Sequence, residues 1–252
     1  MCSTIGIVPP RDVAAYNKRY YELHRDSELA RVKRRHDDNL RFLRDLRRVP
    51  CNDCGESFER YLMDFDHRKP SEKSFGVANG RALLKSRAAL IEEAAKCDIV
   101  CANCHALRTY AQLLDRRSRM TPEQWAPGKS PYIASKRRRW RANLQILNEM
   151  RDVPCADCGR RFLPCVMQFD HRDPLQKEFV VTRIIHRARS VILAEAAKCD
   201  IVCTNCHRER TYQRRLADRA GVVQSEERDP SKVDVAGSNP VSRSELQLLL
   251  LS

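Results

Sequence analysis

The chain has 252 residues and carries 47 Lys and Arg against 33 Asp and Glu, a formal net charge of +14. This length suits about two ordinary domains, and the positive charge favours a polyanionic partner such as a nucleic acid. The sequence shows neither the apolar run of a signal peptide nor the roughly 18 apolar residues of a membrane span, so we expect no membrane contact and a cytoplasmic location.

The first segment, residues 1–26, is expected to be an irregular arm because it opens with Pro9 and Pro10. A basic amphipathic helix is predicted to begin at Ser27, whose hydroxyl suits a helix N-cap, and to end before Pro50. Its apolar stripe follows helical spacing and consists of Leu29, Val32, Leu40, Leu43 and Leu46. We interpret this stripe as the surface that packs the helix on its own module.

The first module is predicted to span residues 27–118, including that helix. Its segment Phe58–Phe65 is rich in β-formers and predicts a short hairpin that ends at an Asp-His dipeptide. Residues 81–96 have the composition of a helix, and Asp98–Val100 reads as a short strand. A second basic helix should start near Asn103.

A second copy of this pattern follows residues 119–134, whose three prolines and one glycine predict a linker. Residues 135–220 form the second module, and Asn143 of its lead-in helix matches Asn39 of the first. That helix has an apolar stripe of Trp140, Leu144, Leu147 and Met150. The offset between the copies falls from 104 to 102 after the middle segment, so one copy has lost two loop residues. Residues 221–252 lack caps and a sustained pattern, and are expected to be disordered.

The positive charge is concentrated at the junction between the copies. Residues 106–141 hold ten Lys and Arg against two acids, a net charge of +8, whereas residues 221–252 hold three against five, a net charge of −2. This clustering favours binding to DNA, with RNA a less favoured partner. The alternative is a basic surface that serves only solubility.

Each copy contains two Cys-x-x-Cys pairs. In a reducing compartment such pairs favour metal binding over disulfides, which remain the alternative. We predict two structural Zn²⁺ ions per chain, each held by four thiolates. The ligand sets are Cys51, Cys54, Cys101 and Cys104, and Cys155, Cys158, Cys203 and Cys206. Of the remaining cysteines, Cys97 and Cys199 occupy matching positions and are expected to be small buried residues rather than ligands.

Each copy also keeps an Asp-His dipeptide and a histidine directly after its last cysteine. They are Asp66, His67 and His105 in the first copy, and Asp170, His171 and His207 in the second. An aspartate and a histidine from different elements can hold a divalent cation, while a neighbouring histidine acts on a phosphate ester as general base. This combination predicts phosphodiester hydrolysis. The alternative is that the histidines are structural groups beside zinc.

The motifs PCNDCG…FDHRKP…CDIVCANCHALRT and PCADCG…FDHRDP…CDIVCTNCHRERT resemble the zinc-bound branch of the HNH endonuclease family, which is common in phages and actinobacteria. The resemblance implies an α+β fold of two tandem zinc-bound ββα-metal modules. It implies that His67 and His171 are catalytic bases, and that Asp66 with His105 and Asp170 with His207 bind a catalytic metal such as Mg²⁺ or Mn²⁺. The family's middle asparagine would fall near residues 96–98 or 198–200, where none occurs.

Arginines near these motifs are candidates for phosphate contacts: Arg68, Arg108, Arg172, Arg208 and Arg210, together with Arg137, Arg138 and Arg139 at the junction. The leading interpretation is a metal-dependent DNA endonuclease that works as a monomer, a covalent pseudo-dimer able to address both strands. One alternative is a non-catalytic zinc-finger protein that binds nucleic acid on the same scaffold. The other is a structural adaptor in a phage or packaging assembly.

Overall fold

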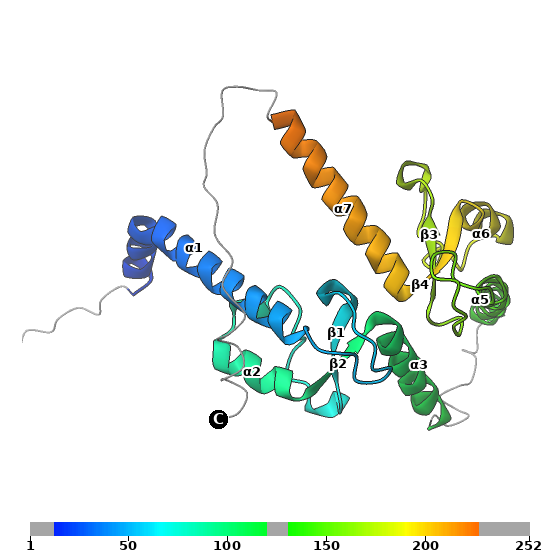
Figure 1. Ribbon diagram of the computed structural model, residues 1–252, viewed down its shortest axis with the longest axis horizontal. Helices are drawn as coiled ribbons and strands as arrows, with labels where there is room; N and C mark the ends of the chain where they lie inside the picture. The colour runs from blue at the N-terminus through cyan, green and yellow to red at the C-terminus, as the bar shows by residue number, and fades with distance from the viewer. Residues whose placement is uncertain (1–12, 120–130, 227–252) are drawn as a thin grey trace, which may run out of the picture. The chain divides into compact units, whose positions relative to one another are not determined.

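The structure is a computed structural model that describes residues 13–119 and 131–226. Each half of the chain has a long helix, a two-stranded antiparallel sheet, and a further helix that continues from the second strand (Figure 1). The residues through Glu209 form one unit, which holds both modules, and a second unit begins at Arg210 inside the last helix. The predicted α+β class is confirmed.

The first helix, α1, spans Val13–Leu46 and is longer than predicted. Its 34 residues contain neither proline nor glycine, so nothing in the sequence interrupts it. The expected irregular arm is therefore wrong for residues 13–26, while residues 1–12 lie outside the described part. Ser27 is not an N-cap, because its hydroxyl donates to the His24 carbonyl oxygen at 2.8 Å within the helix.

The apolar stripe of α1 is buried only toward its C-terminal end. Leu43 is 1% exposed, whereas Leu29 and Val32 are 49% and 40% exposed. The corresponding helix of the second module, α5, spans Pro131–Met150 and buries Leu147 completely. Because α5 begins at Pro131, the last four residues of the predicted linker are helical.

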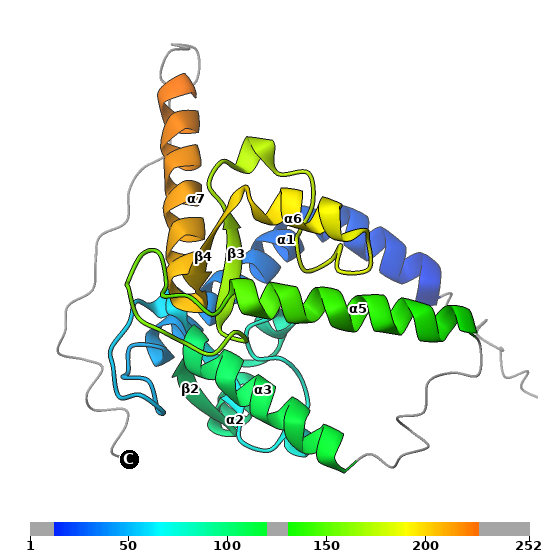
Figure 2. The same cartoon turned by 90° about the vertical axis from the view of Figure 1, so that its right-hand side faces the viewer.

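The two strands of each module are far apart in sequence. Strand β1, Met63–His67, pairs with β2, Cys97–Cys101, so that Met63 faces Cys101 and His67 faces Cys97. In the second module β3, Met167–His171, pairs with β4, Cys199–Cys203, in the same register (Figure 2). The local hairpin predicted within Phe58–Phe65 is wrong, because the partner strand comes about thirty residues later.

The segment between paired strands contains short helices, and each second strand leads into a long helix. In the first module η1 (Arg60–Leu62) precedes β1, and η2 (Pro70–Glu72), η3 (Ala82–Leu84) and α2 (Arg87–Ala95) lie between the strands. The long helix after β2 is α3 (Ala102–Ser118). In the second module the corresponding helices are η4 (Pro174–Gln176), α6 (Arg189–Ala196) and α7 (Thr204–Glu226). The basic helices predicted near Asn103 and Asn205 are confirmed. Residues 221–226 are helical rather than disordered, and residues 227–252 lie outside the described part.

Each module has two apolar clusters. In the first module one cluster joins α1, η3 and α2 around Leu43 and Leu90, and the other surrounds the cysteines with Met63 and Val100. The second module repeats both clusters. The lead-in helix therefore belongs to the core of its own module, as the stripe predicted.

A buried asparagine fixes each lead-in helix to the middle segment. Asn39 is 2% exposed, and its side-chain amide donates to the carbonyl oxygens of Leu83 at 2.9 Å and Lys85 at 3.0 Å. Asn143 makes the matching bonds to Ile185 and Arg187 at 2.8 and 3.2 Å. The sequence match between the two asparagines thus has a structural cause.

Substitution Asn39→Ala should lower the free energy of unfolding of the first module by about 1–3 kcal/mol, because a partly buried carbonyl pair loses its donor. Urea denaturation at saturating zinc measures this change. Arg41→Ala is the control, since its ion pair with Asp38 is exposed and worth less than about 1 kcal/mol. Equal losses in the two variants would contradict the role given to Asn39.

Candidate functional site

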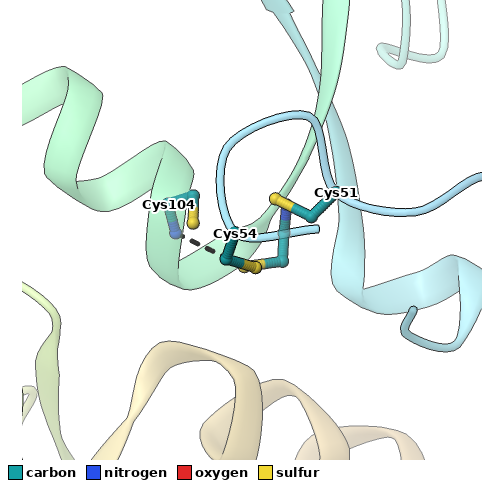
Figure 3. A group of neighbouring side chains, drawn as sticks. Cys51, Cys54 and Cys104 are labelled. Carbon is teal, nitrogen blue, oxygen red and sulfur yellow. Dashed lines mark hydrogen bonds between the residues drawn. The ribbon is translucent and has the colours of Figure 1, made fainter. Parts of the chain in front are cut away.

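Each predicted quartet of cysteines comes together. The Sγ atoms of the first set all lie within 4.8 Å of one another, and so do those of the second set. The sets are Cys51, Cys54, Cys101 and Cys104, and Cys155, Cys158, Cys203 and Cys206. Zinc–sulfur bonds of about 2.3 Å in a tetrahedron place the sulfur atoms about 3.8 Å apart, so either set can close on one ion. Figure 3 shows Cys51 and Cys54 on the loop before β1 and Cys104 at the start of α3. Among the described residues, no other group of three or more metal-ligating side chains lies as close.

The loop that carries the first cysteine pair is shaped by a glycine. Gly55 has φ of 71°, a left-handed conformation that glycine adopts without strain, and its N–H donates to the Cys51 carbonyl oxygen at 2.9 Å. Gly159 repeats this turn with φ of 68°. The Cys101 N–H then donates to the Cys51 sulfur at 3.2 Å, which ties the loop to the end of β2.

The pKa shifts of the cysteine thiols indicate that a bound cation would stabilise the fully deprotonated quartet. Burial raises the pKa of Cys51, but backbone N–H groups of Cys54 and Cys101 outweigh it and lower that pKa to about 7. Burial and the neighbouring sulfur of Cys101 raise the pKa of Cys104 well above its ordinary value. Four thiolates this close repel one another, so full deprotonation requires a positive ion among them.

The predicted pairs of catalytic-metal ligands also converge. His105, in the first turns of α3, places Nε2 3.7 Å from Asp66 Oδ1 on β1. In the second module His207 Nε2 lies 3.5 Å from Asp170 Oδ1. The pair forms because the second Cys-x-x-Cys starts the helix directly after the strand, which brings the next histidine over the sheet.

A further aspartate, absent from the sequence-based site, supports the first pair. Asp64 shares a strand face with Asp66, and its Oδ2 lies 2.8 Å from His105 Nδ1. This hydrogen bond raises the pKa of His105 above its ordinary value. Burial raises the pKa of Asp64, but hydrogen bonds from His105 and Arg208 lower it to about 2. The second module has Gln168 at this position.

His67, a predicted general base, lies on the strand face opposite Asp66, because successive side chains of a strand alternate. Its Nε2 is 2.9 Å from Oε1 of Glu93 on α2, and only 7% of the side chain is exposed. His171 makes the same contact with Glu195 at 2.8 Å. The structure therefore does not place either histidine at the aspartate–histidine pair of its module.

Glu93 is a buried acceptor that the sequence analysis missed. Besides His67, it accepts the N–H groups of Ser74 at 2.7 Å and Phe75 at 3.1 Å, and the Lys96 ammonium at 2.8 Å. Burial raises the pKa of Glu93, but these bonds, led by that from Lys96, hold it well below its ordinary value. The sequence signal that could have revealed this glutamate is the EAAKCD segment, which both copies share.

Four of the eight arginines predicted to contact phosphate bind protein groups. Arg68 and Arg172 donate to carbonyl oxygens after α2 and α6. Arg108 binds Asp53, Asp66 and Asp98, and Arg208 binds Asp64. Arg210 lies on α7. Arg137, Arg138 and Arg139 lie on exposed positions of α5.

The cysteines outside the two quartets differ in burial. Cys97 and Cys199 are both 8% exposed, as expected of small buried residues. Cys165 is partly buried, and Cys2 lies outside the described residues.

No helix in the described ranges has the length and apolarity needed to cross a membrane. The chain matches no protein-family model, no curated protein and no solved structure.

Purified protein should contain two zinc ions per chain, since two complete quartets are present. Structural zinc in finger peptides is worth roughly 10–16 kcal/mol, so Cys51→Ser should unfold the first module and leave one zinc ion. Elemental analysis together with circular dichroism measures both effects. Cys97→Ala is the control and should retain two ions. Fewer than one zinc ion per unaltered chain would contradict the assignment.

Proposed function

We propose that each module is an HNH-type centre that hydrolyses phosphodiester bonds of DNA with a divalent metal. The observation that carries this proposal is the aspartate–histidine pair, Asp66 with His105 at 3.7 Å and Asp170 with His207 at 3.5 Å. The pair is built from a strand and a helix beside a cysteine quartet, and it is built twice. A zinc ion held by four thiolates needs neither residue as a ligand.

The geometry of the pair fits one cation. Two atoms that each lie about 2.1 Å from Mg²⁺ can be at most about 4.2 Å apart, and both pairs satisfy this limit. When bound, Mg²⁺ or Mn²⁺ would polarise the scissile phosphate and neutralise charge on the departing 3′ oxygen. Asp64 holds Nδ1 of His105 and thereby turns Nε2 toward Asp66.

The proposed base is the buried histidine. With its Nε2 proton donated to Glu93, His67 accepts a proton from the attacking water at Nδ1. The Glu93 carboxylate orients the ring and stabilises the imidazolium that forms, as carboxylates do in other histidine-based sites. Because His67 is 7% exposed and lies on the strand face opposite Asp66, this role requires the end of β1 to rearrange as DNA binds.

A basic surface between α3 and α5 supports DNA as the substrate. The two helices line an open pocket with Tyr110, Arg116, Arg117 and Trp140. Exposed arginines occur on the same helix α5, in the junction where the sequence concentrates a net charge of +8. Cationic and aromatic side chains together suit a nucleic-acid backbone and its bases.

A second candidate is a zinc protein that binds nucleic acid without cutting it. Two observations favour it over catalysis: His67 and His171 are buried against glutamates, and the Arg108 guanidinium lies 3.2 Å from Asp66, where it competes with a cation. The two candidates share the zinc sites and the basic surface, so only an activity measurement separates them.

Cleavage of supercoiled plasmid separates the two candidates. With Mg²⁺ or Mn²⁺ the unaltered protein should linearise the plasmid, because two centres on one chain can address both strands. His67→Ala or His171→Ala alone should leave nicking, with linearisation reduced at least about tenfold, and the double variant should be inactive. Asp66→Asn combined with Asp170→Asn should also be inactive.

His186→Ala is the matched control, since this histidine is exposed in the middle segment of the second module. It should cut like the unaltered protein. Absence of cutting by the unaltered, zinc-loaded protein with either metal, together with retained DNA binding, would establish the second candidate. Cutting by the double histidine variant would remove these histidines from the mechanism.

DNA affinity should fall steeply with salt. Each phosphate contact adds about 0.9 to the slope of log K against log salt concentration, so replacing Arg137, Arg138 and Arg139 with Ala should lower that slope by up to about 2.7. Fluorescence anisotropy of a labelled duplex without divalent metal measures it. Lys69→Ala, which removes an exposed lysine paired with Glu72, is the control. An unchanged slope in the triple variant would place the contact elsewhere.

A further inference from the structure

The two modules touch through a reciprocal pair of asparagines. The Asn103 N–H donates to Asn205 Oδ1 at 3.1 Å, and the Asn205 N–H donates to Asn103 Oδ1 at 2.9 Å. Both residues are buried and lie between the cysteines of the second Cys-x-x-Cys of their module. Each N–H belongs to the first turn of a helix, where no intrahelical acceptor exists. Each asparagine thus caps the helix of the other module, and the contact has the self-complementary form of a two-fold interface.

On one side of this pair the contact is polar and charged. Arg208 donates two hydrogen bonds to Asp64, at 2.8 and 2.7 Å, and the Tyr61 hydroxyl donates to the Glu209 carboxylate. Arg208 and Asp64 are 34% and 20% exposed, so water screens this bidentate pair only in part. The polar side therefore joins β1 and η1 of the first module to the start of α7.

On the other side the equivalent positions are apolar. The repeat offsets pair Arg208 with Ala106 and Glu209 with Leu107, while Tyr61 corresponds to Cys165. Ala106 and Leu107 of α3 pack with Cys165 on the cluster that surrounds the second quartet. One half of the interface is thus an ion pair and a hydroxyl bond, and the other half is a hydrophobic contact.

We infer that this face is a pairing surface that selects one first module with one second module over two modules of the same kind. Two second modules would place Arg208 opposite Gln168, and two first modules would place Ala106 opposite Asp64. A pair of second modules leaves the partly buried Arg208 without this carboxylate, and a pair of first modules leaves Asp64 with His105 of its own module but without the arginine. Losses of this kind give interfaces their specificity. The occupant of the surface is the other half of the same chain. The inference does not depend on catalysis.

The full chain with a protease site inserted within residues 120–130 tests the inference. The zinc-loaded protein is folded first and then cut, and sedimentation measures whether the halves stay together. We expect one first half with one second half, at a mass close to that of the uncut chain. Separation of the cut halves, or exchange into pairs of like halves, would overturn the inference.

Charge reversal tests the selectivity. In the cut protein Asp64→Arg alone or Arg208→Asp alone should weaken pairing by roughly 30-fold or more. The double swap should regain at least about tenfold. Arg160→Ala is the matched control, because its ion pair with Glu56 also joins the modules but is exposed at 60% and 45%. It should change pairing by less than about fivefold.

Zinc content distinguishes lost pairing from lost folding. A variant that keeps two zinc ions and yet separates supports the inference. If a reversed variant loses zinc, the neutral and similarly sized changes Asp64→Asn and Arg208→Gln replace it and should also weaken pairing. Failure of the double swap to recover pairing, with zinc retained, would show that the charge pair does not specify the partner.

Discussion

Each module is organised around four cysteine sulfurs that lie close enough together to hold one metal ion. A sheet of two five-residue strands is marginal by itself in water. The quartet joins the loop before β1 to the point where β2 becomes α3, so it fixes the strand pairing and the direction of the helix together. His105 follows Cys104 directly. The distance between Asp66 and His105 is therefore set by the same ligand set that holds the fold.

The features that the sequence predicted correctly are those with short, repeated spacing. Two Cys-x-x-Cys pairs per copy identified both ligand sets, and the strand before the second pair and the helix after it placed Asp66 near His105. The apolar stripe located Leu43 and Leu147 in the cores of their modules. These patterns are local, and their recurrence at a fixed offset separates them from chance.

The features that the sequence did not predict depend on contacts between distant residues. The partner of β1 comes about thirty residues later, and no spacing rule gives that pairing. A dipeptide such as Asp66-His67 does not show which strand face carries the site, since that depends on which helix covers each face. Glu93 was hidden because an acid within a helical segment ordinarily faces water. The prediction of an N-cap at Ser27 was wrong because a serine inside a long helix can donate a hydrogen bond to the preceding turn of the same helix.

The two copies differ in length by two residues, and this difference lies within one short connection. Buried Val77 and Val181 keep the offset of 104, whereas the carbonyls bound by Asn39 and Asn143 have the offset of 102. The two extra residues of the first copy therefore lie within residues 78–82, and both strand registers are the same despite them. Neither the hydrogen bonds of the two asparagines nor the pairing of the strands depends on the exact length of this connection. We therefore expect a change of length there to leave the sheet and the cysteine quartet of the module in place.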